Sequence, residues 1–226
     1  MFRKVPVAHV PTGISLQRYA PTPDADVVPE SGCAVLVVGN DHARKRMNFL
    51  AKVLAACPED VRNDLHLIRV GGGQTDAGRR ALTGAMDAAG VRITLMGRVD
   101  DDELQRLRLS CEALLFPSAA EGYGYPPVEA MAAGLPVLVA DMPNHGSMVP
   151  VESRLPVDEV DAWVDAISDV HATWSQRTEG GVNAVPRPAD EALLAHVQRF
   201  SFDAQSTALG LALDALVDEG GGRAVD

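Results

Sequence analysis

The sequence is poor in cysteine and lacks paired cysteine motifs. Its 226 residues include three cysteines, Cys33, Cys57 and Cys111, and no two of them have C-x-x-C spacing. An odd number of cysteines without such spacing argues against a disulfide framework and against a zinc site. No cluster of His, Cys and Asp has the spacing of metal ligands either. We therefore expect reduced thiols, a cytoplasmic location and no bound metal.

Basic charge and long apolar runs are also scarce. The chain has 20 Lys and Arg against 31 Asp and Glu, which gives a formal net charge of −11. A nucleic-acid-binding protein normally presents a basic face, so we expect no nucleic acid as partner. No apolar run approaches the ~18 residues of a spanning helix, so no membrane span is expected. The segment MFRKVPVAHV has no long apolar core, and a signal peptide is not expected.

What the sequence does contain is a regular alternation of strand-like and helix-like segments. Short apolar, Val- and Leu-rich runs predict buried strands. They lie at 33–39, 65–73, 91–97, 113–117 and 136–140, and helix-like segments lie at 43–57, 75–90, 100–111 and 127–133. This βαβα order predicts an α/β fold with a Rossmann-like, doubly wound parallel sheet.

The last third of the chain has a different pattern. Residues 157–174 look like an amphipathic helix, and 175–188 are polar and punctuated by Gly and Pro. Two further helices are expected at 189–200 and 201–219, with Ser201 as N-cap of the last one. The domain organisation predicted from these patterns runs in four parts. They are a linker and domain entry at 1–30, a Rossmann-like domain at 31–174, a mobile linker at 175–188, and C-terminal helices and tail at 189–226.

The most informative stretch is SAAEGYGYPPVEAMAAGLP, residues 118–136. Glu121 and Glu129 bracket seven residues, which include Gly122, Gly124 and a Pro-Pro pair. Glycines adopt backbone angles that are forbidden to other residues and let a ligand approach closely. Proline suits the first helical turn, so we expect a helix to start at 126 or 127. Its N-terminus would face the glycine loop, an arrangement that binds anions such as phosphate.

This stretch resembles the Glu-x7-Glu signature of family 4 (group 1) retaining glycosyltransferases, which have the two-domain GT-B fold. Tyr123 and Tyr125 depart from the family text, which has Phe and Leu there. Weaker resemblance extends over 9–21, 38–46, 65–73, 91–104 and 199–205. The match covers the C-terminal, donor-binding half of a GT-B enzyme, and the N-terminal half has no counterpart in this sequence.

The resemblance implies a role for each matched residue of the signature. Glu129 matches the glutamate that accepts hydrogen bonds from the ribose hydroxyls, for which a carboxylate offers two acceptor oxygens. Glu121 matches the catalytic glutamate beside the transferred sugar. Backbone N–H groups facing the sugar and the distal phosphate are expected from the loop, at Gly122, Tyr123, Gly124 and Tyr125. Tyr125 would narrow or polarise the sugar pocket.

A lysine and an asparagine complete the implied site. Lys45 matches the lysine that neutralises the diphosphate and helps it to leave, a catalytic role suited to a compact ammonium. Asn40 stands where the family often has an arginine, which leaves one fixed charge fewer. The neighbouring Arg44 or Arg46 would then compensate. Outside the family pattern, the run 44–46 would be read as a solvated helix face.

Other interpretations of these residues remain open from the sequence alone. Glu129 can serve as a first-turn acid that stabilises its helix, and Glu121 can be a solvated loop acid. A hydrolase carboxylate pair is the weaker interpretation, because both groups would have to flank one glycosidic bond. The glycines at 71–73 lack dinucleotide-fingerprint spacing and are interpreted as structural. His145 either faces the cleft or is an exposed loop histidine, and the latter is favoured.

The function implied is retaining transfer of a sugar from a nucleoside diphosphate sugar to a hydroxyl acceptor. The donor would lie at the carboxyl ends of the parallel strands, without cofactor or metal. The N-terminal half would come from a separate chain, docking on an apolar face of the last helix formed by Leu209, Leu211, Leu213, Leu216 and Val217. The alternative is that those residues cover the domain's own sheet. Rival functions are a non-catalytic or truncated nucleotide-sugar-binding module and, less favoured, an epimerase of the same fold.

Overall fold

The computed structural model describes residues 10, 12–21, 31–40, 42–72, 75–143, 148–183 and 185–221, with side chains up to 216. His145, Gly73 and the side chain of Val217 lie outside this part of the chain. The same holds for most of the predicted linker 1–30 and for the tail 222–226.

The described residues form a parallel sheet of six strands in the order β3-β2-β1-β4-β5-β6. The strands are β1 Cys33–Val38, β2 Leu65–Val70, β3 Arg92–Gly97, β4 Ala113–Phe116, β5 Val137–Ala140 and β6 Arg154–Leu155. The five predicted strands and the doubly wound parallel sheet are confirmed. The sixth, β6, was not predicted, because two residues are too few to show a periodic pattern.

The strand order reverses between β1 and β4. From β1 the chain proceeds outward to β2 and β3, then returns to place β4 on the other side of β1. The pairing of β1 with β4 aligns Val35 with Ala113 and Leu36 with Leu114. Open α/β sheets bind ligands beyond the carboxyl ends of strands at such a reversal. The segments that follow β1 and β4 therefore frame the expected site.

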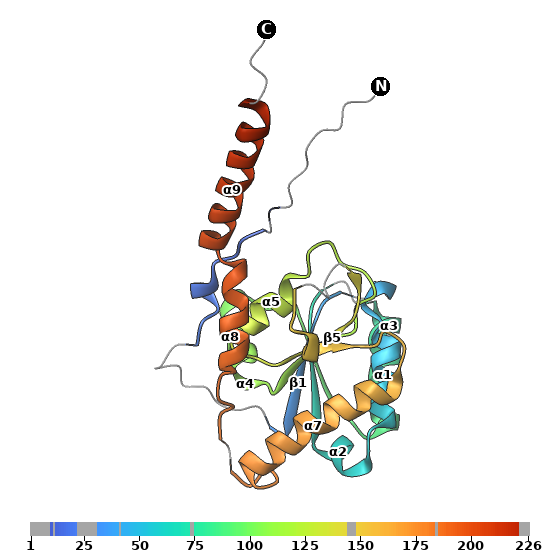
Figure 1. Cartoon of the computed structure of the whole chain (residues 1–226). Coiled ribbons are helices and arrows are strands. Elements are labelled where there is room, and N and C mark those ends of the chain that lie inside the picture. The colour runs from blue at the N-terminus through green and yellow to red at the C-terminus, as the bar shows by residue number, and fades with distance from the viewer. Residues whose placement is uncertain are drawn as a thin grey trace.

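Helices cover both faces of the sheet (Figure 1). One face carries α1 Met47–Ala56, α3 Asp76–Ala89 and α7 Val160–Thr178, with α2 Glu59–Asp64 near their end. The other face carries α4 Asp101–Ser110, α5 Tyr125–Ala132 and α8 Glu191–Val197. Each face has its own buried apolar cluster, because strands covered on both sides are apolar on both sides.

Local side chains define several helix ends. Thr75 caps α3 by accepting a hydrogen bond from the backbone N–H of Gly78 at 3.0 Å. Asp100 caps α4 by accepting from Glu103 N–H at 2.8 Å. Such caps satisfy backbone donors that have no partner within the helix. The predicted N-cap Ser201 is confirmed, since its hydroxyl accepts from Ala204 N–H at 3.1 Å.

The helix predicted over 43–57 is wrong in its first turn. Ala43–Lys45 form a 3-10 turn, Arg46 adopts a left-handed conformation (φ 54°), and α1 starts at Met47. The carbonyl of Arg44 accepts hydrogen bonds from Ala119 N–H at 2.8 Å and from the Ser118 hydroxyl at 3.2 Å. The chain is therefore turned toward the loop after β4, which competes with regular helical geometry here.

The C-terminal segments depart from prediction at the end of α7. This helix runs to Thr178, four residues beyond the predicted end at 174. Arg177, in the last turn of α7, donates to the carbonyl of Val185 at 3.3 Å, and Arg187, beyond the helix, donates to that of Gly134 at 2.5 Å. The mobility expected of 175–188 and the four-part domain division stay predictions.

The last helix, α9 Phe202–Gly221, extends away from the body of the protein (Figure 1). Leu209, Leu211, Leu213 and Leu216 are exposed, with Leu211 67% accessible. The alternative in which these leucines cover the domain's own sheet is therefore wrong. Residues 12–21 run past the start of α9, where Ile14 N–H donates to the carbonyl of Phe200 at 2.8 Å.

Candidate functional site

Lys45 and Glu121 form a partly buried ion pair at the carboxyl ends of β1 and β4. The distance from Lys45 Nζ to Glu121 Oε1 is 2.6 Å, and each side chain is 11% exposed. The Ser118 hydroxyl also donates to Glu121 Oε1. Burial by itself would raise the pKa of Glu121, but the hydrogen bonds from Lys45 and Ser118 and the Lys45 charge lower it below its usual value. The two predicted catalytic residues are thus in contact.

Gly71 makes room for Gly39, and Gly39 makes room for Lys45. A Cβ on Gly71 would lie 1.9 Å from the carbonyl oxygen of Gly39, and Gly71 has a φ of 148°. A Cβ on Gly39 would lie 3.1 Å from Lys45 Cε. No side chain fits at the first position, because the ends of β1 and β2 approach each other backbone to backbone. This geometry agrees with the structural role predicted for Gly71.

The signature loop leads directly into α5. Gly124 is the N-cap with φ 84°, and α5 begins at Tyr125, one residue before the predicted start. Pro126 lies in the first turn, and no side chain caps the helix. Special backbone angles were expected at both glycines, but Gly122 is not among the positive-φ residues. Pro126 and Pro127 have no N–H, so Gly124 and Tyr125 are the residues at this helix end whose N–H groups can bind an anion.

The two tyrosines of the loop lie against each other. Their ring centroids are 4.7 Å apart and the rings are tilted by 44°. The Tyr123 hydroxyl donates to the carbonyl of Thr12 at 2.6 Å, and Tyr125 is 40% exposed. Tyr123 therefore ties the signature loop to residues 12–21. The contribution of Tyr125 to a sugar pocket stays a prediction.

Glu129 belongs to a second cluster, between α4, α5 and residues 12–21. Its carboxylate accepts hydrogen bonds from Arg108 Nη2 and from the Tyr19 hydroxyl, the latter at 3.3 Å. Glu129 is the fifth residue of α5, and that helix has no acid in its first turn. The first-turn-acid interpretation is therefore wrong. Sequence reasoning missed Arg108 and Tyr19, because neither belongs to the signature.

Asn40 and the arginines beside Lys45 play different parts. Asn40 lies next to Lys45 in the lining of a small pocket after β1, and its Oδ1 accepts a hydrogen bond from His42 N–H at 3.4 Å. Arg46 donates to the Asp158 carboxylate and to the carbonyl of Val157. Arg46 is thus directed to the segment before α7. This orientation does not favour Arg46 as a replacement for the arginine that the family often has at the position of Asn40.

Comparison with known proteins gives a family. The family described as "Glycosyl transferases group 1" matches residues 32–173, from β1 to the second half of α7. The chain belongs to this family of glycosyltransferases. The match includes Lys45, Glu121 and Glu129, the three residues on which the predicted site depends.

Several curated proteins similar to this chain are named mannosyltransferases. The chain is 32% identical over 165 residues to phosphatidyl-myo-inositol mannosyltransferase of Mycolicibacterium smegmatis, covering 70% of this chain and 41% of the relative. It is 35% identical over 80 residues to the O-antigen chain mannosyltransferase RfbU of Salmonella typhimurium, covering 35% of this chain and 23% of that protein. The chain thus spans less than half the length of these relatives.

Solved structures confirm the GT-B relationship. Sucrose-phosphate synthase from Thermosynechococcus elongatus matches with a TM-score of 0.71 and 25% identity, over 93% of this chain and 52% of that one. Anabaena HepE, solved in complex with UDP and glucose, matches with a TM-score of 0.69 and 20% identity, over 90% and 55% of the two chains. The fold of this chain therefore corresponds to about half of a GT-B glycosyltransferase.

Two kinds of feature are absent from the described residues. Within that part of the chain, no helix has the length and apolarity to cross a membrane. The same residues contain no group of three or more His, Cys, Asp or Glu that could hold a metal ion. All three cysteines are described, and they are buried and form no disulfide. Burial raises the pKa of the Cys57 thiol to about 11.

Proposed function

We propose that this chain supplies the donor-binding half of a retaining glycosyltransferase. The enzyme transfers a sugar from a nucleoside diphosphate sugar to a hydroxyl acceptor, with no cofactor or metal. The observation that carries the proposal is the Lys45–Glu121 pair beside the uncapped N-terminus of α5, at the reversal of strand order. A cation, a carboxylate, the positive end of a helix and the backbone N–H groups of the loop before it suit a sugar joined to a diphosphate.

The diphosphate lies, in this proposal, between Lys45 and the start of α5. As the bond from the anomeric carbon to the diphosphate breaks, negative charge grows on the departing oxygen. A preorganised ammonium and the positive end of a helix stabilise that charge. Asn40, Gly122, Tyr123, Gly124 and Tyr125 line this region, with backbone N–H groups of the loop facing the sugar and distal phosphate. The acceptor oxygen then bonds to the same face of the anomeric carbon, and its proton passes to the departing diphosphate oxygen.

The two glutamates bind opposite ends of the donor. Glu121 exchanges its contact with Lys45 for the sugar hydroxyls when the diphosphate takes over the lysine. Glu129 accepts hydrogen bonds from the two ribose hydroxyls, since a carboxylate can serve a diol with both oxygens. A charged hydrogen bond of this kind contributes about 1.5–3 kcal/mol.

The acceptor side of the cleft comes from an N-terminal glycosyltransferase half. Three observations support this: the chain spans about half of its structural neighbours, α9 extends from the body, and Leu209, Leu213 and Leu216 are exposed on it. These leucines follow i, i+4, i+7 spacing and so form one stripe of the helix. We propose that this half is a separate chain that docks there, and that the complex is cytoplasmic.

Nucleotide binding by calorimetry tests the proposal. The chain is titrated with GDP, UDP and ADP, and the tightest of them is compared with Glu129→Ala. Loss of a charged hydrogen bond should weaken binding about tenfold or more. Glu59→Ala is the matched control, because Glu59 is exposed at the start of α2, before the amino end of β2. Equal affinities of Glu129→Ala and the wild type would contradict the ribose assignment.

A further inference from the structure

Both oxygens of the Glu129 carboxylate have protein partners, and these come from different elements. Arg108 Nη2, from α4, donates to Oε2, and the Tyr19 hydroxyl donates to Oε1 at 3.3 Å. A carboxylate has about four lone-pair sites, so two remain for a diol. A group held at both oxygens cannot rotate freely, which fixes the direction of the two remaining sites.

Arg108 is itself held firmly. Its side chain is 4% exposed, against 19% for Glu129, so a bound nucleotide would meet the glutamate first. The Arg108 guanidinium lies 5.0 Å from the centre of the Tyr19 ring, in cation–π geometry. Gln105, one turn earlier on α4, donates to the carbonyl of Tyr19 at 2.7 Å. Arg108, Tyr19 and Glu129 therefore form one small packed unit.

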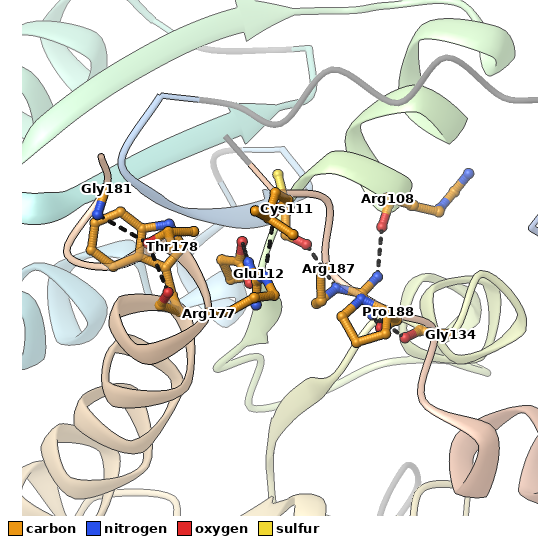
Figure 2. A network of polar contacts seen from close by, with 11 residues as sticks. Arg108, Cys111, Glu112, Gly134, Arg177, Thr178, Gly181, Arg187 and Pro188 are labelled. Atoms are coloured by element: carbon orange, nitrogen blue, oxygen red, sulfur yellow. Dashed lines mark hydrogen bonds and ion pairs between the residues drawn. The ribbon is translucent and has the colours of Figure 1, made fainter. Parts of the chain in front are cut away.

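A second arginine holds the backbone ends of the helices that carry this unit (Figure 2). Arg187 donates from Nε to the carbonyl of Cys111 at 3.0 Å and from Nη1 to the carbonyl of Gly134 at 2.5 Å. These carbonyls lie just beyond the C-termini of α4 and α5, where partial negative charge favours a cation. Figure 2 shows the Arg108 side chain directed away from Arg187, while its carbonyl faces that arginine at 3.5 Å.

From these contacts we propose that Arg108 is a positioning residue for nucleotide binding: with Tyr19, it holds the Glu129 carboxylate in the orientation that receives the ribose diol. The inference rests on the proposed role of Glu129. A charge as buried as that of Arg108 is costly unless a carboxylate pairs with it. If Arg108 served only to join α4 to α5, its removal would weaken every ligand to the same degree.

The test compares each nucleotide with its 2′,3′-dideoxy counterpart, which lacks the diol. Calorimetry on the wild-type chain measures the affinities for GDP, UDP, ADP and their dideoxy forms. We define the diol preference as the ratio of the affinity for a nucleotide to that for its dideoxy form, and expect it to be about tenfold or more. Arg108→Met should reduce this preference to within about threefold of unity, and Tyr19→Phe should reduce it less. Arg108→Lys retains the charge and should keep part of it. The control is Arg106→Met, on the exposed side of the same helix, which should keep the full preference.

The outcomes separate the inference from the function on which it rests. If Glu129→Ala abolishes the wild-type diol preference but Arg108→Met leaves it intact, the positioning role of Arg108 is overturned and the ribose assignment stands. A wild-type chain without any diol preference overturns the ribose assignment, and the positioning role with it. If Arg108→Met does not fold, Tyr19→Phe and Arg108→Lys decide: an undiminished preference in both overturns the inference, and a reduced one supports it.

Discussion

Lys45 and Glu121 satisfy each other's charge. Burying a charge costs free energy unless an opposite charge pairs with it. Removing either residue would therefore leave the other charge buried without a partner and destabilise the fold. The same pair is also ready for exchange, because a diphosphate offers Lys45 a stronger anion and sugar hydroxyls offer Glu121 new donors. At the scale of residues, the ion pair of Lys45 and Glu121 is the contact that a bound donor would replace in the proposed function.

The Glu121 carboxylate should make stability depend on pH. Its pKa in the folded chain is lower than the usual 4.5, so its contribution is present above that value and is lost as pH falls through the folded pKa. Glu121→Gln removes this contribution. Urea unfolding should therefore show wild type more stable than Glu121→Gln at about pH 6, with a smaller gap at about pH 3. An equal gap at both pH values would contradict the assignment, and Glu59→Gln serves as control.

Lys45 should discriminate between ligands with and without a diphosphate. Lys45→Ala removes the cation and leaves Glu121 facing the phosphates, so the affinity for the nucleoside diphosphate should fall about tenfold or more. The affinity for the free nucleoside should change little. The exposed Lys52 on α1 provides the control, as Lys52→Ala. If calorimetry finds both ligands weakened equally, or neither, the lysine does not contact the diphosphate.

At the scale of elements, the site depends on how α5 begins. Gly124 holds a left-handed conformation that directs the chain from the loop into the helix, and no side chain caps this helix end. The 3-10 turn before α1 has a similar role, since the left-handed Arg46 ends it and Lys45 is directed to the loop after β4. Both irregular turns place residues of the proposed donor site at the same edge of the sheet.

Alanine substitution at the two loop glycines should separate the effect of backbone strain from that of steric room for a side chain. Gly124→Ala should lower the free energy of unfolding by about 1–2 kcal/mol, because an L-residue is strained at positive φ. Gly122→Ala should be close to neutral for stability, since its φ is ordinary and a Cβ there would meet no atom within 4 Å. Chemical denaturation measures both. Equal losses for the two variants would show that conformation at Gly124 is not the cause.

At the scale of the whole molecule, the chain combines the proposed donor site with a helix, α9, that extends from the body. Two apolar clusters, one on each face of the sheet, account for the folded body, and α9 adds exposed leucines beyond it. In a two-half enzyme, closure of the halves aligns the reactants and excludes water. The chain on its own leaves one side of the proposed donor site open.

The purified chain should therefore bind nucleotide but transfer no sugar. An assay with a panel of nucleoside diphosphate sugars and generic hydroxyl acceptors should detect at most slow donor hydrolysis, because water replaces the missing acceptor side. Adding a matching N-terminal half should restore transfer. Leu213→Glu, on the stripe of α9, should reduce that restoration without changing nucleotide affinity. Efficient retaining transfer by the monomer would contradict the half-enzyme proposal.

Local patterns in the sequence determined much of this protein. Apolar runs marked five of the six strands, and glycine, proline and helical periodicity placed most helices to within a few residues. The spacing of Glu121 and Glu129, with the glycines and prolines between them, was enough to indicate the family. Such features are readable because each depends on neighbours along the chain. The 3-10 turn at Lys45 was not readable, because contacts with Ser118 and Ala119 override the helical pattern there.

Only the tertiary structure decided which distant side chains meet. The Glu129 carboxylate accepts hydrogen bonds from Tyr19 and Arg108, which lie 110 and 21 residues away in sequence. Arg187 donates hydrogen bonds to carbonyls at the ends of both α4 and α5. Side-chain pairing across such separations depends on the strand order and on how the helices pack, and neither leaves a periodic trace. The exposure of the α9 leucines is likewise a tertiary fact, since the same apolar spacing serves a buried face or an open one.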